Sequence, residues 1–410
     1  MNLILLLAAA ALLFALSRYA FSAVQTLTRA WPLRRRRWVH AAYWTLSAVP
    51  LVLLGIAAAQ RGASPGLRVL AAVWLLADFF GKLLISLAML ADDLRRLLIR
   101  LRRALRPAPR PAAGGITRSE FLAKAGLLAG AAPALLIGDG VLRGAHNYQI
   151  RRITVPLPGL PAGWNGARLV QLSDIHAGSF WDREAVARGV QLVLDEQPDL
   201  ICFTGDLVNS VADEMRDYAA LFGRLAAPLG VYSVLGNHDY GDYAAWPDAE
   251  AKARNLQQLK DIHREMGWDL LVNAHRILRR GGDPLALIGV ENWSAQGRFP
   301  KYGKLDEAYA GAEAALGILL SHDPSHWRAQ VLPGYPRIGL TLSGHTHGFQ
   351  FGIEAAFLKW SPVQYLYPEW AGLYQEGSQY LYVNRGFGYL AFPGRIGMPP
   401  EITVIELRQG

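Results

Sequence analysis

The sequence of 410 residues contains a single cysteine, Cys202. One cysteine cannot form an intramolecular disulfide, and it cannot supply a metal site built from several thiolates. Any metal site in this chain must therefore draw mainly on nitrogen and oxygen ligands. Cys202 stands within the apolar run LICF at 200–203, which indicates a small buried side chain.

Acidic residues are scarce in the first 143 positions, which hold 5 Asp and Glu against 19 Lys and Arg. The remaining positions hold 28 acidic and 23 basic residues, so the overall net charge of +9 comes from the N-terminal part. The basic residues there stand beside long apolar runs. They therefore indicate membrane topology rather than a nucleic-acid surface, and we expect no nucleic-acid partner.

Three apolar runs, at 3–24, 39–59 and 67–91, are each close to the length of about 20 residues that crosses a bilayer. A secretory signal peptide fits the first run less well, because that run lacks a basic start and further apolar runs follow it. The arginine-rich segments 29–37 and 95–110 mark the cytoplasmic side. We therefore predict three transmembrane helices with basic cytoplasmic loops over residues 1–106.

Residues 107–147 are predicted to form a linker and a fourth transmembrane or interfacial helix. The stretch PAPRPAAGG at 107–115 is typical of a linker, and 121–137 is apolar but interrupted by Lys124 and Pro133. If this segment spans the membrane, the rest of the chain lies outside the cytoplasm; if it lies on the surface, the rest faces the cytoplasm. We favour four spans in a bacterial-type inner or plasma membrane, with an extracytoplasmic C-terminal domain.

Residues 148–410 have the pattern of an α/β domain. Five short apolar runs, at 167–172, 200–203, 230–235, 314–320 and 338–342, are predicted as strands, and each ends directly at Asp, Asn, His or a short polar turn that carries them. Residues 184–196 have helical spacing and are predicted to cross over between the first two strands. Because sites in layered α/β proteins collect at the C-terminal ends of strands, we expect these polar residues to converge.

The polar residues after the five runs have the chemistry of a two-metal site. They are Asp174, His176, Asp206, Asn237, His238, His322, His345 and His347. All except His238 suit hard-to-borderline divalent cations, and Asp206 is the natural bridge because a carboxylate can hold one cation on each oxygen. Two cations roughly 3.5–4 Å apart can activate a water between them and clamp phosphoryl oxygens. The set therefore predicts hydrolysis of a phosphate ester or pyrophosphate bond by a metal-bridging hydroxide.

Two further residues are predicted to be catalytic without binding metal. His238 follows the metal-ligand candidate Asn237 directly and is expected to stabilise charge on the phosphate or protonate the leaving oxygen. Asp239 is expected to orient the His238 ring.

These motifs resemble those of the calcineurin-like metallophosphoesterases. The resemblance covers about residues 149–407 and rests on D-I-H (174–176), G-D-L-V-N (205–209), G-N-H-D (236–239), S-H-D-P (321–324) and G-H-T-H-G (344–348), in the family's order. It implies a two-sheet β-sandwich flanked by helices, with a dinuclear centre of Mn, Fe or Zn ions. One metal would be held by Asp174, His176, Asp206 and His347, and the other by Asp206, Asn237, His322 and His345.

The C-terminal tail resembles that of the family's membrane-associated branch, through N-R-G-F-G (384–388) and P-E-I (400–402). That branch includes cell-wall phosphodiesterases and UDP-2,3-diacylglucosamine hydrolases, which act on a lipid A precursor. Relatives often continue G-H-T-H-G with a second glycine and a glutamine, whereas this chain has Phe349 before Gln350. The difference falls where the resemblance places the rim of the substrate site.

The segment 349–374 is rich in aromatic residues and leaves the substrate open. It fits a lid that dips into the membrane interface and admits a lipid phosphate, and it fits equally a loop packed on its own domain. Three functions are therefore weighed: a phosphoesterase for a lipid-linked envelope substrate, an anchored phosphodiesterase for a soluble, nucleotide-like substrate, and a non-enzymatic membrane sensor or scaffold. The complete set of metal-binding positions disfavours the third.

Overall fold

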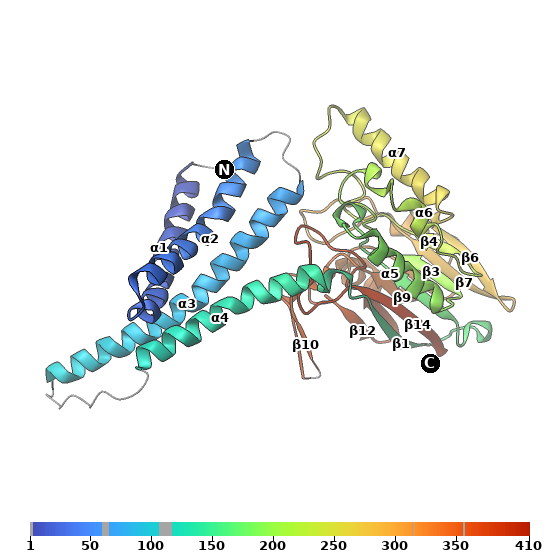
Figure 1. The fold of residues 1–410 in the computed structure, drawn as a ribbon. Helices are drawn as coiled ribbons and strands as arrows, with labels where there is room; N and C mark the ends of the chain where they lie inside the picture. Colours follow the sequence, from blue (N-terminus) through green and yellow to red (C-terminus); the bar gives the residue numbers. More distant parts are fainter. Residues whose placement is uncertain (1–2, 60–64, 106–116, 314, 356) are drawn as a thin grey trace. The chain divides into compact units, whose positions relative to one another are not determined.

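The chain folds into two compact units, Met1–Asp139 and Gly140–Gly410 (Figure 1). The computed structural model describes residues 3–59, 65–105, 117–313, 315–355 and 357–410. The predicted linker at 107–115 lies outside the described residues. Met1–Asp139 is the N-terminal unit and Gly140–Gly410 is the C-terminal unit.

The N-terminal unit consists of long helices. They are α1 (Leu3–Thr28), α2 (Leu33–Ala59), α3 (Pro65–Leu105) and α4 (Arg118–Leu142), the last of which ends in the C-terminal unit. Within the described part of the chain, three stretches are long and apolar enough to cross a membrane: Ala10–Thr28, Leu70–Arg102 and Arg118–His146. The third contains the segment 121–137, for which the sequence left spanning and interfacial positions open. The predicted second span, 39–59, lies in the 27-residue helix α2, which is not among these three.

Small residues bring the helices of this unit close together. A Cβ atom on Gly81 of α3 would lie 2.5 Å from the carbonyl oxygen of Gly130 in α4, so the two helices touch backbone to backbone there. Such close approach is typical of helix packing in membranes, where packing and hydrogen bonds replace the hydrophobic effect. Lys82 pairs with Asp78 at 2.5 Å and donates to Ser17 of α1 at 2.8 Å. Asp78 and Lys82 are therefore paired with each other within the helix bundle.

The C-terminal unit is built on two six-stranded sheets. The first has the order β1 (Gln149–Leu157), β14 (Glu401–Gln409), β2 (Arg168–Leu172), β3 (Leu200–Phe203), β4 (Val231–Ser233) and β5 (Asp269–Leu270). The second has the order β12 (Gly372–Glu376), β13 (Gln379–Val383), β9 (Ile338–Ser343), β8 (Gly317–Leu320), β7 (Asp283–Gly289) and β6 (Ala274–Arg280). A separate two-stranded hairpin joins β10 (Ile353–Ala355) to β11 (Leu358–Trp360).

The two sheets pack face to face and helices cover their outer faces, as the family resemblance implied. One buried cluster joins Leu169 and Cys202 of the first sheet to Leu287 and Leu340 of the second, which makes it the core of a sandwich. A second cluster packs α5 (Arg183–Asp195), α6 (Ala219–Phe222) and α7 (Ala249–Glu265) on the first sheet. A third packs α8 (Leu305–Tyr309) and the segment leading into α9 (Leu332–Gly334) on the second.

Helix α5 shows how sequence and topology agree. Asp182 caps it by accepting a hydrogen bond from the Ala185 amide, and apolar residues at helical spacing, including Val186 and Val190, face the core. The helix connects β2 to β3, which are parallel neighbours, as the predicted crossover requires. Strands β2, β3 and β4 are mutually parallel, and so are β8 and β9. Each group therefore delivers the loops after its strands to one edge of its sheet.

Candidate metal centre

The predicted ligands lie in the loops directly after β2, β3, β4, β8 and β9, and the structure brings these loops together. Much of this backbone has an unusual conformation. Five of the ligand residues have left-handed backbone angles, with φ between +49° and +69°; they are Asp174, His176, Asp206, His345 and His347. Such conformations cost about 1–3 kcal/mol each in non-glycine residues and concentrate at functional sites, where the surrounding structure holds them.

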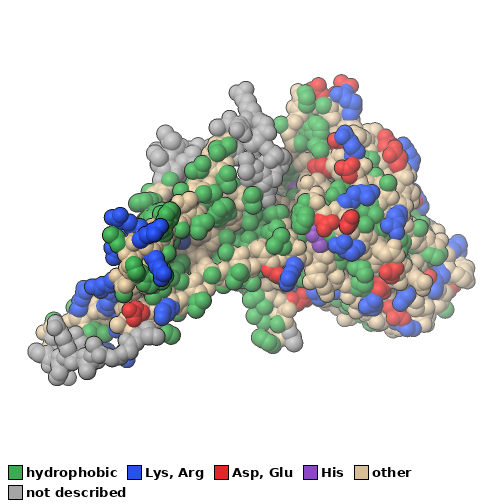
Figure 2. Space-filling view, in the orientation of Figure 1, with side chains coloured by type: hydrophobic (Ala, Val, Ile, Leu, Met, Phe, Trp, Pro, Cys, Tyr) green, Lys and Arg blue, Asp and Glu red, His purple; other side chains and the backbone are tan. Residues whose placement is uncertain are grey.

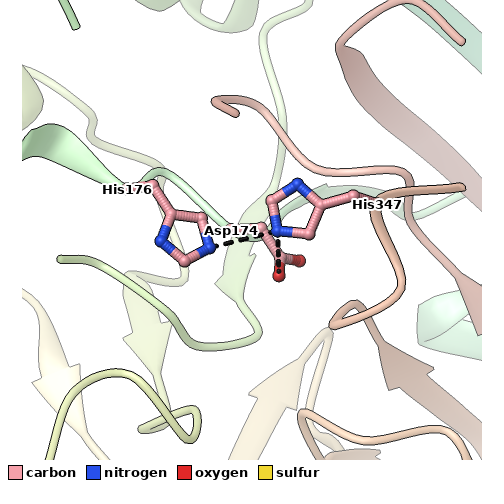
Figure 3. Close-up of side chains that lie close together, drawn as sticks. All are labelled: Asp174, His176 and His347. Carbon is pink, nitrogen blue, oxygen red and sulfur yellow. Dashed lines mark hydrogen bonds and ion pairs between the residues drawn. The ribbon is translucent and has the colours of Figure 1, made fainter. Parts of the chain in front are cut away.

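Asp174, His176 and His347 form the first group of converging donor atoms (Figure 3). The Nε2 atom of His347 lies 3.1 Å from Oδ1 of Asp174 and 3.1 Å from Nε2 of His176. Oδ2 of Asp206 lies 3.6 Å from the same His176 nitrogen. All four residues are buried. This is the set that the resemblance assigned to one metal.

Asp206, His322 and His345 form the second group. Nε2 of His322 lies 3.1 Å from Oδ2 of Asp206 and 3.3 Å from Nδ1 of His345. That His345 nitrogen is also 2.9 Å from Oδ1 of Asn237. Oδ2 of Asp206 therefore faces both groups. The sequence led us to expect one cation on each carboxylate oxygen, but Oδ1 instead accepts from the His238 amide at 2.8 Å.

The donor distances fit a cation at the centre of each group. Ligand atoms about 2.1 Å from a shared ion lie roughly 3.0–3.6 Å apart, and the contacts above fall close to that range. Two imidazole Nε2 atoms at 3.1 Å, those of His176 and His347, have no stable arrangement as two lone pairs. A cation between them satisfies both. The residues present thus fit two divalent ions, bound through oxygen and nitrogen.

The electrostatics favour the metal-binding forms of Asp174, Asp206 and His176. Burial lowers the pKa of His322, but Asp206 and Asp174 outweigh burial and raise it to about 10, so this ligand must lose a proton when it binds an ion. Burial alone would raise the pKa of Asp206, but the charges of His322 and His238 outweigh it and hold the pKa well below its ordinary value. Burial would also raise the pKa of Asp174, but the neighbouring His347 outweighs burial and lowers this pKa below its ordinary value. Burial lowers the pKa of His176 well below 6.5. Both carboxylates are therefore ionised and this imidazole is neutral at pH 7, as metal ligands must be.

At two motif positions glycine is required because neighbouring side chains come too close to leave room for a Cβ atom, and not because the backbone turns sharply there. A Cβ on Gly344 would lie 1.9 Å from Oγ of Ser173 and 2.2 Å from Oδ2 of Asp174, and a Cβ on Gly236 would lie 2.2 Å from Oδ1 of Asp206. Any side chain at either position would displace a carboxylate ligand. Glycine lets the loops after β9 and β4 press against the carboxylates from the loops after β2 and β3.

His238 is placed beside both groups without belonging to either. Its amide donates to Oδ1 of Asp206 at 2.8 Å, and its ring lies against the rings of His176 and Tyr243. The ring Nδ1 is 2.8 Å from the carbonyl oxygen of Asn209, which can only accept, so Nδ1 carries a proton. Nε2 is thus the ring nitrogen that remains to act on a substrate.

Asp239 contacts different atoms from those expected. Its carboxylate accepts hydrogen bonds from the backbone amides of Gly236, Asp206, Leu207 and Val208, at 2.8–3.3 Å. The carbonyl of Asn209, and not this carboxylate, orients the His238 ring. A buried carboxylate with four amide donors nearby is already satisfied. Asp239 therefore acts as a positioning residue that ties the loop after β3 to the loop after β4.

Sequence reasoning did not assign Tyr367 or Asp323 to the site. The Tyr367 hydroxyl lies 2.8 Å from Nε2 of His345 and donates to Oδ2 of Asp323 at 3.1 Å. Because the hydroxyl gives its only proton to the carboxylate, it accepts from His345, whose Nδ1 lone pair then points at the second group. Both residues lay in segments that the sequence singled out, the S-H-D-P block and the aromatic segment 349–374. Their distance along the chain hid the contact.

We expect Tyr367→Phe to weaken metal binding at the second group by about 10–100-fold, because groups that orient a ligand imidazole have effects of that size. The measurement is chelator competition followed by metal analysis of the purified protein. Tyr365→Phe, which removes the same hydroxyl from an exposed ring of the same segment, is the matched control. Equal metal affinity in the two variants would show that Tyr367 does not position His345.

Arg395, also not assigned from sequence, is buried beside the first group. Its guanidinium donates to the carbonyl oxygens of Arg385 at 2.8 Å and Gly388 at 2.9 Å, and reaches that of His347 at 3.4 Å. It therefore joins the backbone of the loop that carries His347 to the N-R-G-F-G segment.

A cavity of about 200 Å³ opens beside the donor groups. Its polar lining includes candidate ligands, His238 and Arg298. Its apolar lining is supplied by Phe299, Phe349, Val363, Leu366 and Leu390. Phe349 has φ +60°, a value that a glycine would adopt without strain. The aromatic segment is thus divided, with Tyr367 and Trp370 buried against the domain and Tyr365 and Phe357 exposed.

Known families match both units. Residues 1–145 match the model described as probable calcineurin-like phosphoesterase, transmembrane domain, and residues 167–349 match calcineurin-like phosphoesterase. A Bacillus subtilis protein, uncharacterized metallophosphoesterase YkuE, is 30% identical over 72% of this chain and 98% of its own length. The chain belongs to the calcineurin-like phosphoesterase family.

Two animal relatives have names that describe both a transmembrane part and a metallophosphoesterase domain. A zebrafish (Danio rerio) transmembrane protein with metallophosphoesterase domain is 34% identical over 67% of this chain, and a cattle (Bos taurus) protein of the same name is 33% identical over 72%. The matches span 61% and 65% of those relatives. With its transmembrane family domain and apolar helices, the chain is an integral membrane protein. We refer to the C-terminal unit from here on as the phosphoesterase unit.

Proposed function

We propose that this protein is a metal-dependent hydrolase of phosphate esters that acts on a lipid-linked envelope substrate. The observation that carries the proposal is the single oxygen of Asp206 shared by two donor groups at the wall of a cavity. When bound there, two divalent cations lower the pKa of a water and neutralise charge on phosphoryl oxygens. Family membership supports the same chemistry.

The chain's own residues account for the other steps. Arg298 lines the cavity and can hold a phosphate oxygen by a charge-assisted hydrogen bond. In its imidazolium form, His238 keeps Nδ1–H on the Asn209 carbonyl and can donate the Nε2 proton to the leaving oxygen. Asp239 and Tyr367 do not touch the substrate in this scheme and act by holding the loops and His345 in place.

The lipid-linked part of the proposal is supported by the apolar lining residues of the cavity. Phe349 and Leu366 line it and are exposed, so an apolar group attached to the phosphate could leave the cavity along them. The alternative, a soluble nucleotide-like substrate, draws on the same wall, because Phe299 could stack on a base. The filled ligand positions argue against a non-enzymatic sensor.

The test is hydrolysis by purified full-length protein with Mn²⁺, each reaction run with and without chelator. A small chromogenic phosphodiester is compared with a detergent-solubilised sugar-nucleotide lipid. We expect chelator-sensitive turnover that strongly favours the lipid. Turnover of the soluble ester alone would retain the hydrolase and reject the lipid substrate, and turnover of neither would reject both.

We further propose that the phosphoesterase unit lies outside the cytoplasm of a bacterial-type membrane, on the strength of the arginine distribution and the apolar length of α4. The same assay decides this when the diester is membrane-impermeant and is added to sealed spheroplasts that express the protein. Hydrolysis without lysis is expected, and hydrolysis only after lysis would place the unit on the cytoplasmic side.

A further inference from the structure

The hairpin β10–β11 has two chemically different faces. Its strands pair Ile353 with Trp360, Glu354 with Lys359 and Ala355 with Leu358. Because paired residues of a hairpin point to the same side, Ile353, Leu358 and Trp360 share one face and Glu354 and Lys359 share the other. The hairpin projects from the phosphoesterase unit, and hydrophobic side chains cover its end (Figures 1 and 2).

The polar face, and not the apolar one, is turned to the protein. Glu354 accepts from Arg385 at 2.7 Å and from Arg151 at 2.5 Å, and the buried Arg385 also pairs with Glu401 at 2.6 Å. Lys359 donates to the carbonyl of Ala371 and lies over the Trp370 ring. These bonds fix the base of the hairpin on the domain, so the hairpin projects in a defined orientation.

The apolar side chains of the hairpin are left exposed. Phe357, at the turn, is 92% exposed, and Ile353 and Leu358 are 49% and 43% exposed. Phe351 packs edge-on against Trp360 and is itself exposed. A surface hairpin normally turns its apolar face inward, so this reversed arrangement marks a surface made for an apolar partner.

The bilayer that holds the N-terminal unit is the partner that these features favour. Helix α4, one of the candidate spans, ends at Leu142, and β1 begins at Gln149, so only a few residues connect a membrane helix to the domain. Trp360 and the exposed Tyr365 lie within 3.5 Å of each other beside the hairpin, and these residue types prefer the membrane–water interface. Phe349, two residues before Phe351 in the chain, is also exposed and lines the cavity.

We propose that the hairpin Ile353–Trp360 inserts Phe357 and its apolar face into the bilayer interface and so docks the phosphoesterase unit on the membrane. This inference deepens the proposed function. Only one consequence of docking rests on that function, namely that a lipid-linked phosphate reaches the cavity along Phe349. Docking itself can be measured without any turnover.

The test uses full-length protein in lipid nanodiscs with an environment-sensitive fluorophore on Phe357→Cys. The native Cys202 is buried, so the parent protein should remain unlabelled and serves as the labelling control. Glu250→Cys, on the exposed surface of α7, is the matched position. We expect a blue-shifted emission at 357 that is quenched by lipids carrying a nitroxide near the headgroup, and neither effect at 250.

Two fluorescence results would each overturn the proposal. Emission at 357 that matches emission at 250 would show that the hairpin stays in water. A blue shift at 357 that nitroxide lipids do not quench would show that protein, such as a second copy of this chain, covers it.

A second experiment measures activity. Phe357→Asp should lower kcat/KM for a vesicle-embedded lipid substrate and leave hydrolysis of the small soluble diester unaffected. Loss of both activities alike would contradict a docking role, whereas a negative fluorescence result with normal lipid turnover would reject docking and leave the proposed function standing.

Discussion

Asp206→Asn is expected to reduce turnover by at least about a thousandfold while the phosphoesterase unit remains folded. The carboxylate oxygen Oδ2 faces His176 and His322 and is the donor shared by both groups. Asparagine keeps an oxygen that can accept from the His238 amide but loses the charge and the second oxygen. Several kcal/mol of charge stabilisation are then lost, and each 1.36 kcal/mol is about tenfold in rate.

This expectation is checked by kcat together with bound metal per chain and the thermal unfolding midpoint. Asp213→Asn makes the same chemical change at an exposed carboxylate that pairs with Arg216, and it should leave all three unchanged. An Asp206→Asn protein that kept both metals and more than a tenth of its activity would mean that the shared oxygen is not the centre of the chemistry.

His238→Ala should lower kcat by about 10²–10⁴-fold, the range typical of a general acid, while metal content stays at the wild-type value. The separation is expected because the His238 ring bonds to the Asn209 carbonyl and belongs to neither donor group. His275→Ala removes a ring that bonds to the Ala308 carbonyl, outside the site, and serves as the control.

The leaving group distinguishes proton donation from other roles of His238. If Nε2 protonates the leaving oxygen, an aryl ester with an acidic leaving group should lose much less activity in His238→Ala than an alkyl ester. Equal losses for the two esters would instead assign His238 to binding or charge stabilisation. Reduced metal content in the variant would place His238 with the ligands and contradict the assignment made here.

The sequence predicted the elements that carry the site because the relevant signals are local. The crossover helix predicted at 184–196 is found at Arg183–Asp195, where a cap residue and helical apolar spacing stand next to each other in the chain. The strand predicted at 200–203 is found with those bounds. Buried strands that end at Asp, Asn or His also identified the ligand candidates, since a ligand at the end of a strand follows it directly in sequence.

The family resemblance alone assigned the ligands to two groups. The contacts between the ligand side chains became known only from the structure. His176 and His347 are 171 residues apart and meet at 3.1 Å because β2 and β9 lie in facing sheets. The five left-handed ligand residues are Asp or His, types that adopt this conformation more often than most, but residue type alone does not say which of them do so. Asp239 shows the same limit: its sequence neighbour His238 suggested a partner, but its carboxylate binds amides of the neighbouring loop.

Membership of an aromatic segment says nothing about which ring is buried. Tyr365 and Tyr367 are two positions apart, yet one is exposed and the other bonds to the ligand His345. The same limit applies to the hairpin. The order of apolar and charged residues from Ile353 to Trp360 is consistent with two different faces, but it does not say which face contacts the rest of the domain. Arg385 and Arg151 decide that, by pairing with Glu354. Local patterns fix what each segment is, whereas contacts between distant segments depend on how the whole chain packs, and only the tertiary structure contains them.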